Sequence, residues 1–197
     1  TGEVTGVPSQ LESLDRILGG LQPSDLLILA GRPSMGKSAL AVTIAANAST
    51  QKAPSSESAH LKHENYTSGI FSLEMSAEQM AMRLLSAEAQ IPSDELRRGK
   101  LDEAAWHQVV RASQALNMRP MFIDDTPALS VAALRSRARR LMRTQGLSLL
   151  VVDYLQLMRG SSAYAGTNRV QEISEITQAL KAIAKELNIP VLALSQL

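Results

Sequence analysis

The stretch Gly31-Arg32-Pro33-Ser34-Met35-Gly36-Lys37-Ser38 matches the pattern G-x-x-x-x-G-K-[ST], in which a glycine-rich loop binds phosphate groups through its backbone. The apolar run at 26–30 before it favours a β-strand, and the small and apolar residues at 39–48 after it favour a helix. This strand–loop–helix context separates a phosphate-binding loop from a chance match. The alternative, a plain glycine turn before a helix, leaves the lysine and the serine unexplained. The sequence therefore predicts that the chain binds a nucleoside triphosphate.

The residues of this loop have distinct expected tasks. The helix that follows offers its positive N-terminal end to the phosphates. Lys37 is expected to reach the β- and γ-phosphates and to act in catalysis, and the Ser38 hydroxyl is expected to coordinate Mg²⁺. ATP and Mg²⁺ are therefore the expected cofactors. The residues predicted to contact the nucleotide are Gly31, Arg32, Pro33, Ser34, Met35, Gly36, Lys37, Ser38 and Ala39.

The composition of the 197 residues is that of an ordinary folded domain, with 45% hydrophobic and 20% charged residues. The chain has no cysteine, which excludes disulfides, cysteine-bound zinc and thiol nucleophiles and suits a reducing cytoplasm. No apolar run approaches the roughly 18 residues of a membrane span, so no membrane contact is expected. With one Trp, three Tyr and two Phe, the sequence argues against a platform that stacks several bases.

Both ends of the chain indicate a longer polypeptide, because it begins at Thr1 without a methionine and stops at Leu197 within an apolar run. Residues 1–25 are expected to form a linker segment with a short amphipathic helix that ends at a glycine pair. Residues 26–197 are expected to form one domain, truncated at its C-terminus. Within it, the polar stretch 51–68 lacks periodicity and is interpreted as an inserted surface loop.

Apolar runs that favour strands alternate along the chain with amphipathic stretches that favour helices. Each expected strand is almost continuously apolar, which is typical of a parallel sheet covered by helices on both faces, so we predict an α/β fold. Right-handed crossovers then place the carboxyl ends of all strands at one edge, where ligands bind. The expected strands are 26–30, 70–73, 121–123, 147–157 and 191–197, and the expected helices are 39–48, 76–89, 92–99, 101–116, 130–144 and 170–187.

Polar side chains at the ends of these strands are expected to gather near the phosphate-binding loop. Asp153 ends the most apolar strand, a position from which a carboxylate holds Mg²⁺ through a water molecule. Glu74 is placed to polarise the water that attacks the γ-phosphate, and Gln196 is placed to sense that phosphate by a hydrogen bond. A stabilising position at a helix N-terminus is the alternative for Glu74, and a satisfied polar strand end for Gln196. Asp124 and Asp125 share the strand-end position but are interpreted as caps of the next turn.

Five arginines crowd one expected helix, and Arg135, Arg139 and Arg143 among them are i, i+4 neighbours that form a stripe. A solvated face, a subunit contact and binding to DNA phosphates are all compatible with this stripe. The Gly/Ser-rich segment 159–169 follows the Asp153 strand and carries an arginine at each end. We expect it either to couple the nucleotide state to something bound elsewhere or to be a plain connection.

Several motifs, in this order along the chain, resemble the C-terminal RecA-like ATPase domain of the bacterial replicative DNA helicases, the DnaB family. The likeness covers nearly the whole chain and departs only at about residues 51–68. The paired Arg-Pro-Ser-Met and Ser-Leu-Glu-Met-Ser signatures are specific. The motifs are Thr5-Gly6-Val7-Pro8, Leu14-Asp15, Gly19-Gly20-Leu21-Gln22-Pro23, Arg32-Pro33-Ser34-Met35-Gly36-Lys37-Ser38, Phe71-Ser72-Leu73-Glu74-Met75-Ser76, Asp153-Tyr154-Leu155-Gln156-Leu157-Met158 and Ala193-Leu194-Ser195-Gln196-Leu197.

The resemblance implies a RecA-like P-loop NTPase that forms a homohexameric ring around single-stranded DNA and moves 5′→3′ while it hydrolyses ATP between subunits. It implies that the Gln196 strand lies between the strand before the phosphate-binding loop and the Asp153 strand. It also implies that the segment 159–169 faces the central channel, and that primase and a helicase loader are partners of a cytoplasmic, nucleoid-associated protein. The candidate DNA contacts are Arg159, Asn168 and Arg169.

The resemblance further implies that a neighbouring subunit supplies an arginine that lies beyond Leu197. Such a group is worth about 10³–10⁵ in rate in comparable NTPases, so residues 1–197 alone are expected to bind nucleotide yet hydrolyse it slowly and unwind poorly. Three functions stay open at this point. They are a helicase motor, a RecA-like recombinase or ring ATPase without unwinding activity, and a nucleotide-dependent assembly or loading switch.

Overall fold

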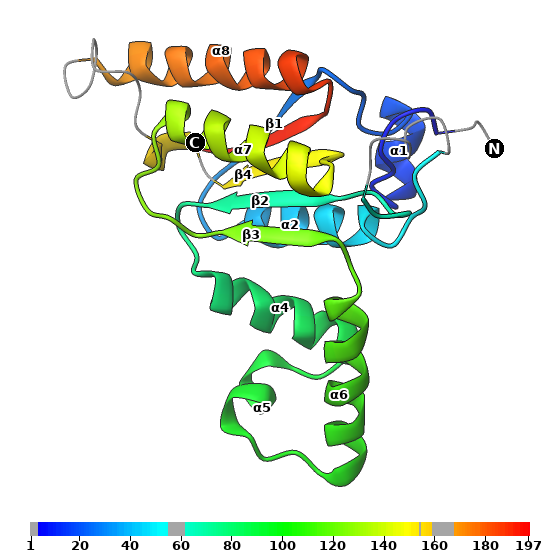
Figure 1. Cartoon of the computed structure of the whole chain (residues 1–197). Helices are drawn as coiled ribbons and strands as arrows, with labels where there is room; N and C mark the ends of the chain where they lie inside the picture. Colours follow the sequence, from blue (N-terminus) through cyan, green and yellow to red (C-terminus); the bar gives the residue numbers. More distant parts are fainter. Residues whose placement is uncertain (1–3, 55–61, 154, 159–167) are drawn as a thin grey trace.

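A parallel sheet of five strands forms the centre of the computed structural model, which describes residues 4–54, 62–153, 155–158 and 168–197 (Figure 1). The strand order is β1-β5-β4-β2-β3, and every neighbouring pair is parallel. The predicted α/β class is confirmed, as is the position of the Gln196 strand between β1 and β4. The strands are β1 (Leu26–Gly31), β2 (Ser68–Ser72), β3 (Met121–Asp124), β4 (Leu149–Asp153) and β5 (Val191–Gln196).

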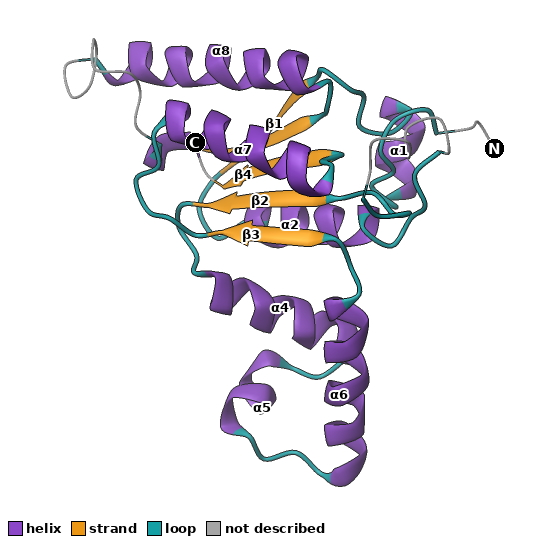
Figure 2. Ribbon diagram, in the orientation of Figure 1, coloured by secondary structure: helices purple, strands orange, loops and turns teal. Residues whose placement is uncertain are grey.

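Helices connect successive strands, as Figure 2 shows by colour. Several of these helices begin at a serine whose side chain caps the helix, as the sequence predicts. The Ser76 hydroxyl accepts a hydrogen bond from the Gln79 backbone N–H, and the Gln79 side-chain oxygen accepts one from the Ser76 backbone N–H. Ser130 caps its helix in the same way, by accepting from Ala133 N. The helices are α1 (Glu12–Leu18), α2 (Lys37–Ala48), α4 (Ala77–Ala89), α5 (Ser93–Arg98), α6 (Glu103–Asn117), α7 (Val131–Gln145) and α8 (Arg169–Leu187).

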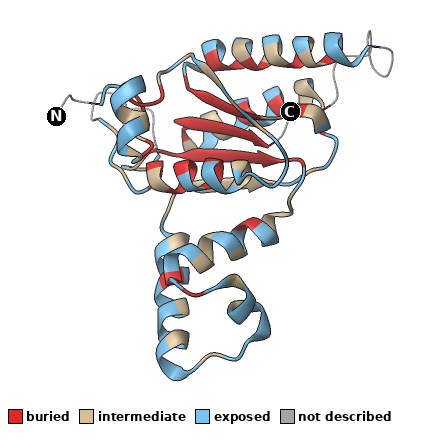
Figure 3. Ribbon diagram, turned by 180° about the vertical axis from the view of Figure 1, so that it is seen from behind, coloured by how far each residue is buried: buried red, intermediate tan, exposed pale blue. Residues whose placement is uncertain are grey.

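Both faces of the sheet are covered, because successive side chains of each strand point to opposite faces. On β4, Leu150 and Val152 pack with residues of α7 and α8. Leu149 and Val151 of the same strand pack with residues of α2 and with the N-terminal part of the chain, where Leu21 is buried. Figure 3 shows the buried strands between helices whose outer sides are exposed. This arrangement explains why each strand reads as a nearly continuous apolar run.

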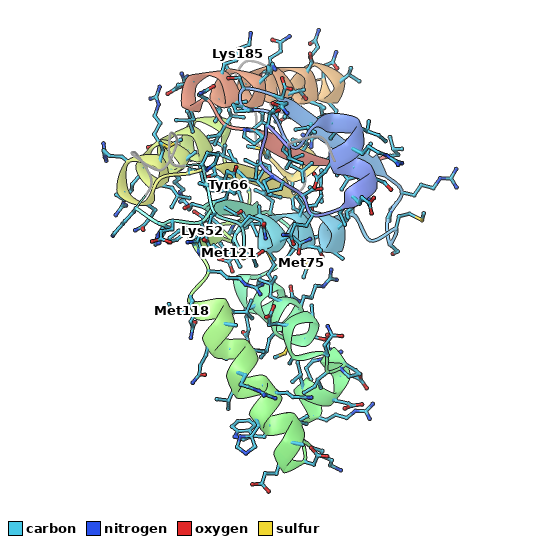
Figure 4. The ribbon with its side chains drawn as sticks, turned by 90° about the vertical axis from the view of Figure 1, so that its right-hand side faces the viewer. Lys52, Tyr66, Met75, Met118, Met121 and Lys185 are labelled. Atoms are coloured by element: carbon cyan, nitrogen blue, oxygen red, sulfur yellow. The ribbon has the colours of Figure 1, made fainter. Side chains whose placement is uncertain are left out.

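The helices α4, α5 and α6 form an arm that projects from the sheet (Figures 1 and 4). A small cluster of Ala89, Ile91 and Ala112 holds the arm together. Trp106 on α6 is 58% exposed, and Met118, labelled in Figure 4 next to the end of α6, is 85% exposed. The arm therefore has little core of its own. Within the described part of the chain, no helix is both long enough and apolar enough to cross a membrane.

The predicted strand at 147–157 is wrong at both ends, because β4 covers only Leu149–Asp153 and Leu155–Leu157 forms a 3₁₀ helix. Leu147, Leu155 and Met158 are each 2% exposed although they lie outside the strand. The apolar run thus records burial in the core, and burial does not distinguish a strand from the buried turns on either side of it.

The predicted surface loop at 51–68 is wrong at its C-terminal end, because Ser68 begins β2 and Thr67 is also buried. Before this, the described flanks of the stretch pair with each other: Lys52 and Asn65 form an antiparallel bridge. Residues 55–61 lie outside the described part of the chain. The polar composition of the stretch concealed this pairing and the burial of residues 66–68.

Candidate nucleotide-binding site

The phosphate-binding loop (residues 31–38) leaves the carboxyl end of β1 and enters α2 at Lys37. Gly36 has φ of 81° at the start of α2, a left-handed conformation that favours glycine, and Ser34 has φ of 62°. A Cβ at Gly36 would meet no described atom within 4 Å, so the backbone conformation, rather than crowding, calls for glycine there. Turns of this kind leave successive backbone N–H groups free to bind an anion.

A cavity of about 290 Å³ lies at the carboxyl edge of the sheet, beside this loop. It gathers residues from the loop, from α2, from the turn after β2, from α4, and from the ends of β4 and β5. Gly31, Arg32 and Met35, also predicted to contact nucleotide, do not line it, and the Met35 side chain is 74% exposed. The lining residues are Pro33, Ser34, Gly36, Lys37, Ser38, Ala39, Glu74, Met75, Arg83, Asp153 and Gln196.

Lys37 is the first residue of α2, and its ammonium group donates a hydrogen bond to the backbone carbonyl of Arg32, 2.7 Å away. The Lys37 ammonium group therefore contacts the phosphate-binding loop itself. A lysine ammonium carries three donors and bends easily, so an anion in the cavity can draw it away from a single neutral acceptor.

Asp153 ends β4 and is only 1% exposed. Burial raises the pKa of its carboxyl group, and the nearby Glu74 carboxylate raises it further, while a hydrogen bond from Ser38 and the charges of Lys37 and Arg83 act in the opposite direction. Its Oδ2 atom has no hydrogen-bond partner within the described part of the chain. The site therefore contains a buried carboxylate whose charge is only partly compensated.

Glu74 lies in the turn after β2 rather than at the strand end where it was predicted, since β2 stops at Ser72. The Ser72 hydroxyl accepts a hydrogen bond from Met75 N and donates one to Met75 O, which closes the turn around Glu74. Leu73 N donates to Asp153 O over 2.6 Å and holds this turn against the end of β4. Glu74 is exposed and faces the cavity alongside the buried Asp153.

Gln196 reaches the cavity because β5 lies between β1 and β4. Its register partner on β1 is Gly31, the residue at which the phosphate-binding loop begins. On its other side β5 pairs with β4 as far as Val152 and Ala193, so its last residue and Asp153 line the same cavity. The sheet topology thus assembles the five residues predicted to act on nucleotide or metal, which are Lys37, Ser38, Glu74, Asp153 and Gln196.

The expected convergence of Asp124 on this site is wrong, because β3 is an edge strand that β2 separates from β4. Asp124 instead accepts a hydrogen bond from Thr126 N and forms an ion pair with Arg137 at 2.6 Å. Burial alone would raise the pKa of Asp124, but these bonds outweigh it and hold the pKa below its ordinary value. Asp125 accepts from Ala77 N and so caps α4. The interpretation as a cap of the next turn is therefore confirmed for Asp124 and wrong for Asp125, whose partner lies in an earlier helix.

Arg83 is a residue of the site that the sequence did not reveal. It lies on α4, lines the cavity, and its charge lowers the pKa of Asp153. A single arginine on an amphipathic helix has no local signature. Its spacing from Met80, which is fully buried on the same helix, was the only available hint that it borders the core.

The candidate DNA contacts are only partly within the described residues. Arg159 lies outside them. Asn168 caps α8 by accepting from Gln171 N, and the Arg169 guanidinium pairs with Glu172 in the first turn of α8. In the predicted arginine stripe, Arg135 and Arg139 of α7 both pair with Glu186 of α8. These arginines therefore join two helices of the same chain.

A family model for the DnaB-like helicase C-terminal domain matches residues 6–197. The chain is 53% identical over 194 residues to the replicative DNA helicase DnaB of Rickettsia felis, a match that covers 98% of this chain and 38% of that protein. A solved ATPase domain aligns with a TM-score of 0.85 at 30% identity, over 99% of this chain and 65% of that one. A DnaB-like replicative helicase, solved in a study of its interactions with primase, aligns with a TM-score of 0.83 at 29% identity, over 100% and 44% of the two chains. The chain therefore belongs to the DnaB-like helicase C-terminal domain family and has its RecA-like ATPase fold.

Proposed function

We propose that this chain is the ATP-hydrolysing motor domain of a hexameric replicative helicase, which moves 5′→3′ on single-stranded DNA and unwinds duplex at the replication fork. Membership of the family and the composition of the cavity support this proposal. The chain spans 38% of the length of the Rickettsia felis relative, so the ring, the DNA track and the unwinding are part of the proposal. So are primase and a loader as partners, and a cytoplasmic location at the nucleoid.

The observation that carries the proposal is the unpartnered Oδ2 of Asp153, buried beside Ser38. A buried acceptor without a partner is unfavourable by about 1–3 kcal/mol, and more when it is charged, unless something else satisfies it. Mg²⁺ prefers oxygen ligands, keeps several waters and takes few protein ligands besides phosphate oxygens. The Ser38 hydroxyl and, through a water, the Asp153 carboxylate would hold this ion. When bound, Mg²⁺ supplies positive charge that neutralises the phosphates.

Binding of ATP begins at the phosphate-binding loop. The backbone N–H groups of the phosphate-binding loop, except at Pro33, donate hydrogen bonds to the triphosphate, and the positively polarised N-terminal end of α2 attracts its charge. Lys37 exchanges the carbonyl of Arg32 for the β- and γ-phosphate oxygens, which are charged acceptors and therefore bind it more strongly than a neutral carbonyl. The loop is thus ready to clamp the phosphates without refolding.

Hydrolysis uses the residues on the other side of the cavity. Glu74 orients the attacking water and accepts its proton, a position that the turn after β2 fixes against the end of β4. The Gln196 amide donates a hydrogen bond to the γ-phosphate. Arg83 lines the same cavity and adds a positive charge that stabilises the negative charge developing on the transferred group.

The test is the substitution Glu74→Gln in the protein at its natural length, with Glu78→Gln as a matched control. Glu78 is an exposed carboxylate of α4, four residues away, that does not line the cavity. Glu74→Gln should lower the rate of ATP hydrolysis by about 10²–10⁴ while ATP still binds, because only the proton acceptor is lost. Unchanged hydrolysis would instead favour a nucleotide-dependent switch.

The alternative of a recombinase or ring ATPase without unwinding activity predicts the same effect of Glu74→Gln on hydrolysis. Strand separation distinguishes the two functions. The protein should displace the labelled strand of a forked duplex in the presence of ATP, and Glu74→Gln should abolish this displacement. Hydrolysis stimulated by DNA without any displacement would support the alternative.

A further inference from the structure

At the carboxyl edge of the sheet, where the cavity lies, β5 extends further than its neighbour β4. Their pairing stops at Val152 with Ala193, whereas β5 continues to Gln196. On its other side β5 stays paired to its end, because Gly31 of β1 is the register partner of Gln196. The backbone N–H and carbonyl of Gln196 therefore face the side on which β4 has already ended. Because β4 cannot bond them, the N–H and carbonyl groups of Gln196 need other hydrogen-bond partners.

The side chain of Gln156 provides these partners. Its Oε1 accepts a hydrogen bond from Gln196 N over 3.2 Å, and its Nε2 donates one to Gln196 O over 2.9 Å. The same Nε2 also donates to the Ser195 hydroxyl at 2.9 Å. A primary amide carries one acceptor and two donors, so this side chain imitates the backbone of a neighbouring strand and extends the sheet where β4 stops.

The backbone of Gln156 is itself firmly placed. It belongs to the 3₁₀ helix Leu155–Leu157, and both Leu155 and Met158 are 2% exposed in the core between the sheet and α8. Its carbonyl accepts a hydrogen bond from the Arg169 guanidinium. Arg169 also pairs with Glu172, which is 6% exposed in the first turn of α8. One residue thus contacts both the end of β5 and the start of α8.

We infer that Gln156 is a positioning residue, which holds Gln196 at the γ-phosphate and ties the end of β5 to the N-terminal turn of α8. This inference rests on the proposed role of Gln196. Without Gln156, the last residues of β5 are held by β1 alone among the described strands and can tilt away from the cavity. A displacement of about 1 Å at a reacting group lowers a rate by up to about 10²-fold, whereas the phosphate-binding loop still binds nucleotide.

The experiment compares Gln156→Ala and Gln156→Glu in the protein at its natural length, with Gln178→Ala as the control on the exposed face of α8. The glutamate has the same shape, so it keeps the fold, but it cannot donate to the Gln196 carbonyl. Both variants should lower kcat by up to about 10²-fold and leave the Kd for a fluorescent ATP analogue nearly unchanged. Hydrogen exchange should become faster at the end of β5 and in the first turn of α8, while Gln178→Ala behaves like the unmodified protein.

Comparison with Gln196→Ala separates this inference from the proposed function. If Gln196→Ala lowers kcat but both Gln156 variants hydrolyse normally, the positioning role is refuted. If Gln196→Ala leaves kcat unchanged, the proposed role of Gln196 fails, and unchanged exchange at the end of β5 in the Gln156 variants would refute the tie as well. The double variant Gln156→Ala/Gln196→Ala should be no slower than Gln196→Ala alone, because both act through one contact. If the Gln156 variants lost as much nucleotide affinity as they lost in kcat, the positioning role would also be refuted.

Discussion

Replacing Asp153 with asparagine is expected to stabilise the magnesium-free protein and at the same time to abolish magnesium-dependent ATP hydrolysis. The carboxyl group is 1% exposed, and burial raises its pKa because the ionised form loses contact with water. Glu74 repels the ionised form, and Ser38 and Lys37 compensate only in part. Asparagine has nearly the same shape and carries no charge, so it removes the unfavourable term without opening a cavity.

The sign of the pH dependence follows from the raised pKa. The folded protein binds a proton at Asp153 more readily than the unfolded chain, in which an aspartate has a pKa of about 3.9. The free energy of unfolding therefore falls as the pH rises from about 4 through the folded-state pKa, and it stays lowered at neutral pH. An unsatisfied buried polar group changes stability by about 1–3 kcal/mol, and we expect the lower end because Lys37 and Ser38 lie close. About 1 kcal/mol corresponds to an increase of about 2–4 °C in Tm for a domain of this size.

Thermal unfolding followed by circular dichroism, in the presence of a chelator, measures this effect. The asparagine variant should melt above the unmodified protein at pH 7, and the difference should shrink towards zero as the pH falls to about 4. Addition of ATP and Mg²⁺ should reverse the order. Ligand at about 100 times its Kd stabilises a folded protein by about 2.7 kcal/mol, and the variant should lose the part of this gain that depends on magnesium.

Asp124→Asn is the matched control, because Asp124 also ends a strand at this edge but has a lowered pKa. Its charge stabilises the fold above the unfolded-state pKa of about 3.9, so the asparagine variant should melt lower at pH 7, by about 1 kcal/mol in unfolding free energy. Its rate of ATP hydrolysis should not change. If Asp153→Asn also melts lower at pH 7 without magnesium, Asp153 serves the fold as an ordinary acceptor, and the reasoning about its uncompensated charge is refuted.

Three further substitutions test other parts of the site and its support. Lys37→Ala should weaken ATP binding measured by calorimetry by about 10-fold or more, since a charge-assisted hydrogen bond contributes about 1.5–3 kcal/mol, whereas Lys52→Ala, which removes an exposed amine, should not. Arg83→Ala should lower kcat more than it raises the Kd for ATP, because its positive charge lies in the cavity where negative charge develops during hydrolysis. Equal changes in kcat and Kd would mean that Arg83 acts in binding alone. Glu186→Gln should lower the urea midpoint of unfolding without changing the m value, because it removes the ion pairs by which Arg135 and Arg139 of α7 bind α8.

The parts of the fold that could be predicted from sequence are those in which a local pattern has one physical cause. The two glycines of the phosphate-binding loop, together with its lysine and serine, specify a turn that binds an anion. Ser76 and Ser130 mark helix starts because their hydroxyls satisfy backbone N–H groups. Continuous apolar runs mark strands, and all five predicted strands are present, although only the inner ones such as β2 and β4 are fully buried on both faces.

The remaining features depend on contacts between distant parts of the chain. Asp124 and Asp153 follow apolar strands in the same way, but β3 lies at the edge of the sheet and β4 lies near its centre. Only the strand order decides which carboxylate reaches the cavity. Arg83 was missed for the same reason, because its place depends on how α4 packs so that Arg83 reaches the cavity, which no spacing in the sequence expresses.

Unequal strand lengths are what make the edge of this sheet into a site. If β4 and β5 ended together, their last residues would pair with each other and the backbone groups of Gln196 would have a strand partner. Instead β4 stops at Asp153, the chain turns into the 3₁₀ helix, and β5 continues past it to Gln196. This step leaves space beside the phosphate-binding loop, and it also leaves backbone groups of β5 that the Gln156 amide satisfies. A substitution that lengthened β4 would therefore improve the sheet while it closed the cavity, so the short strand is better explained by function than by stability.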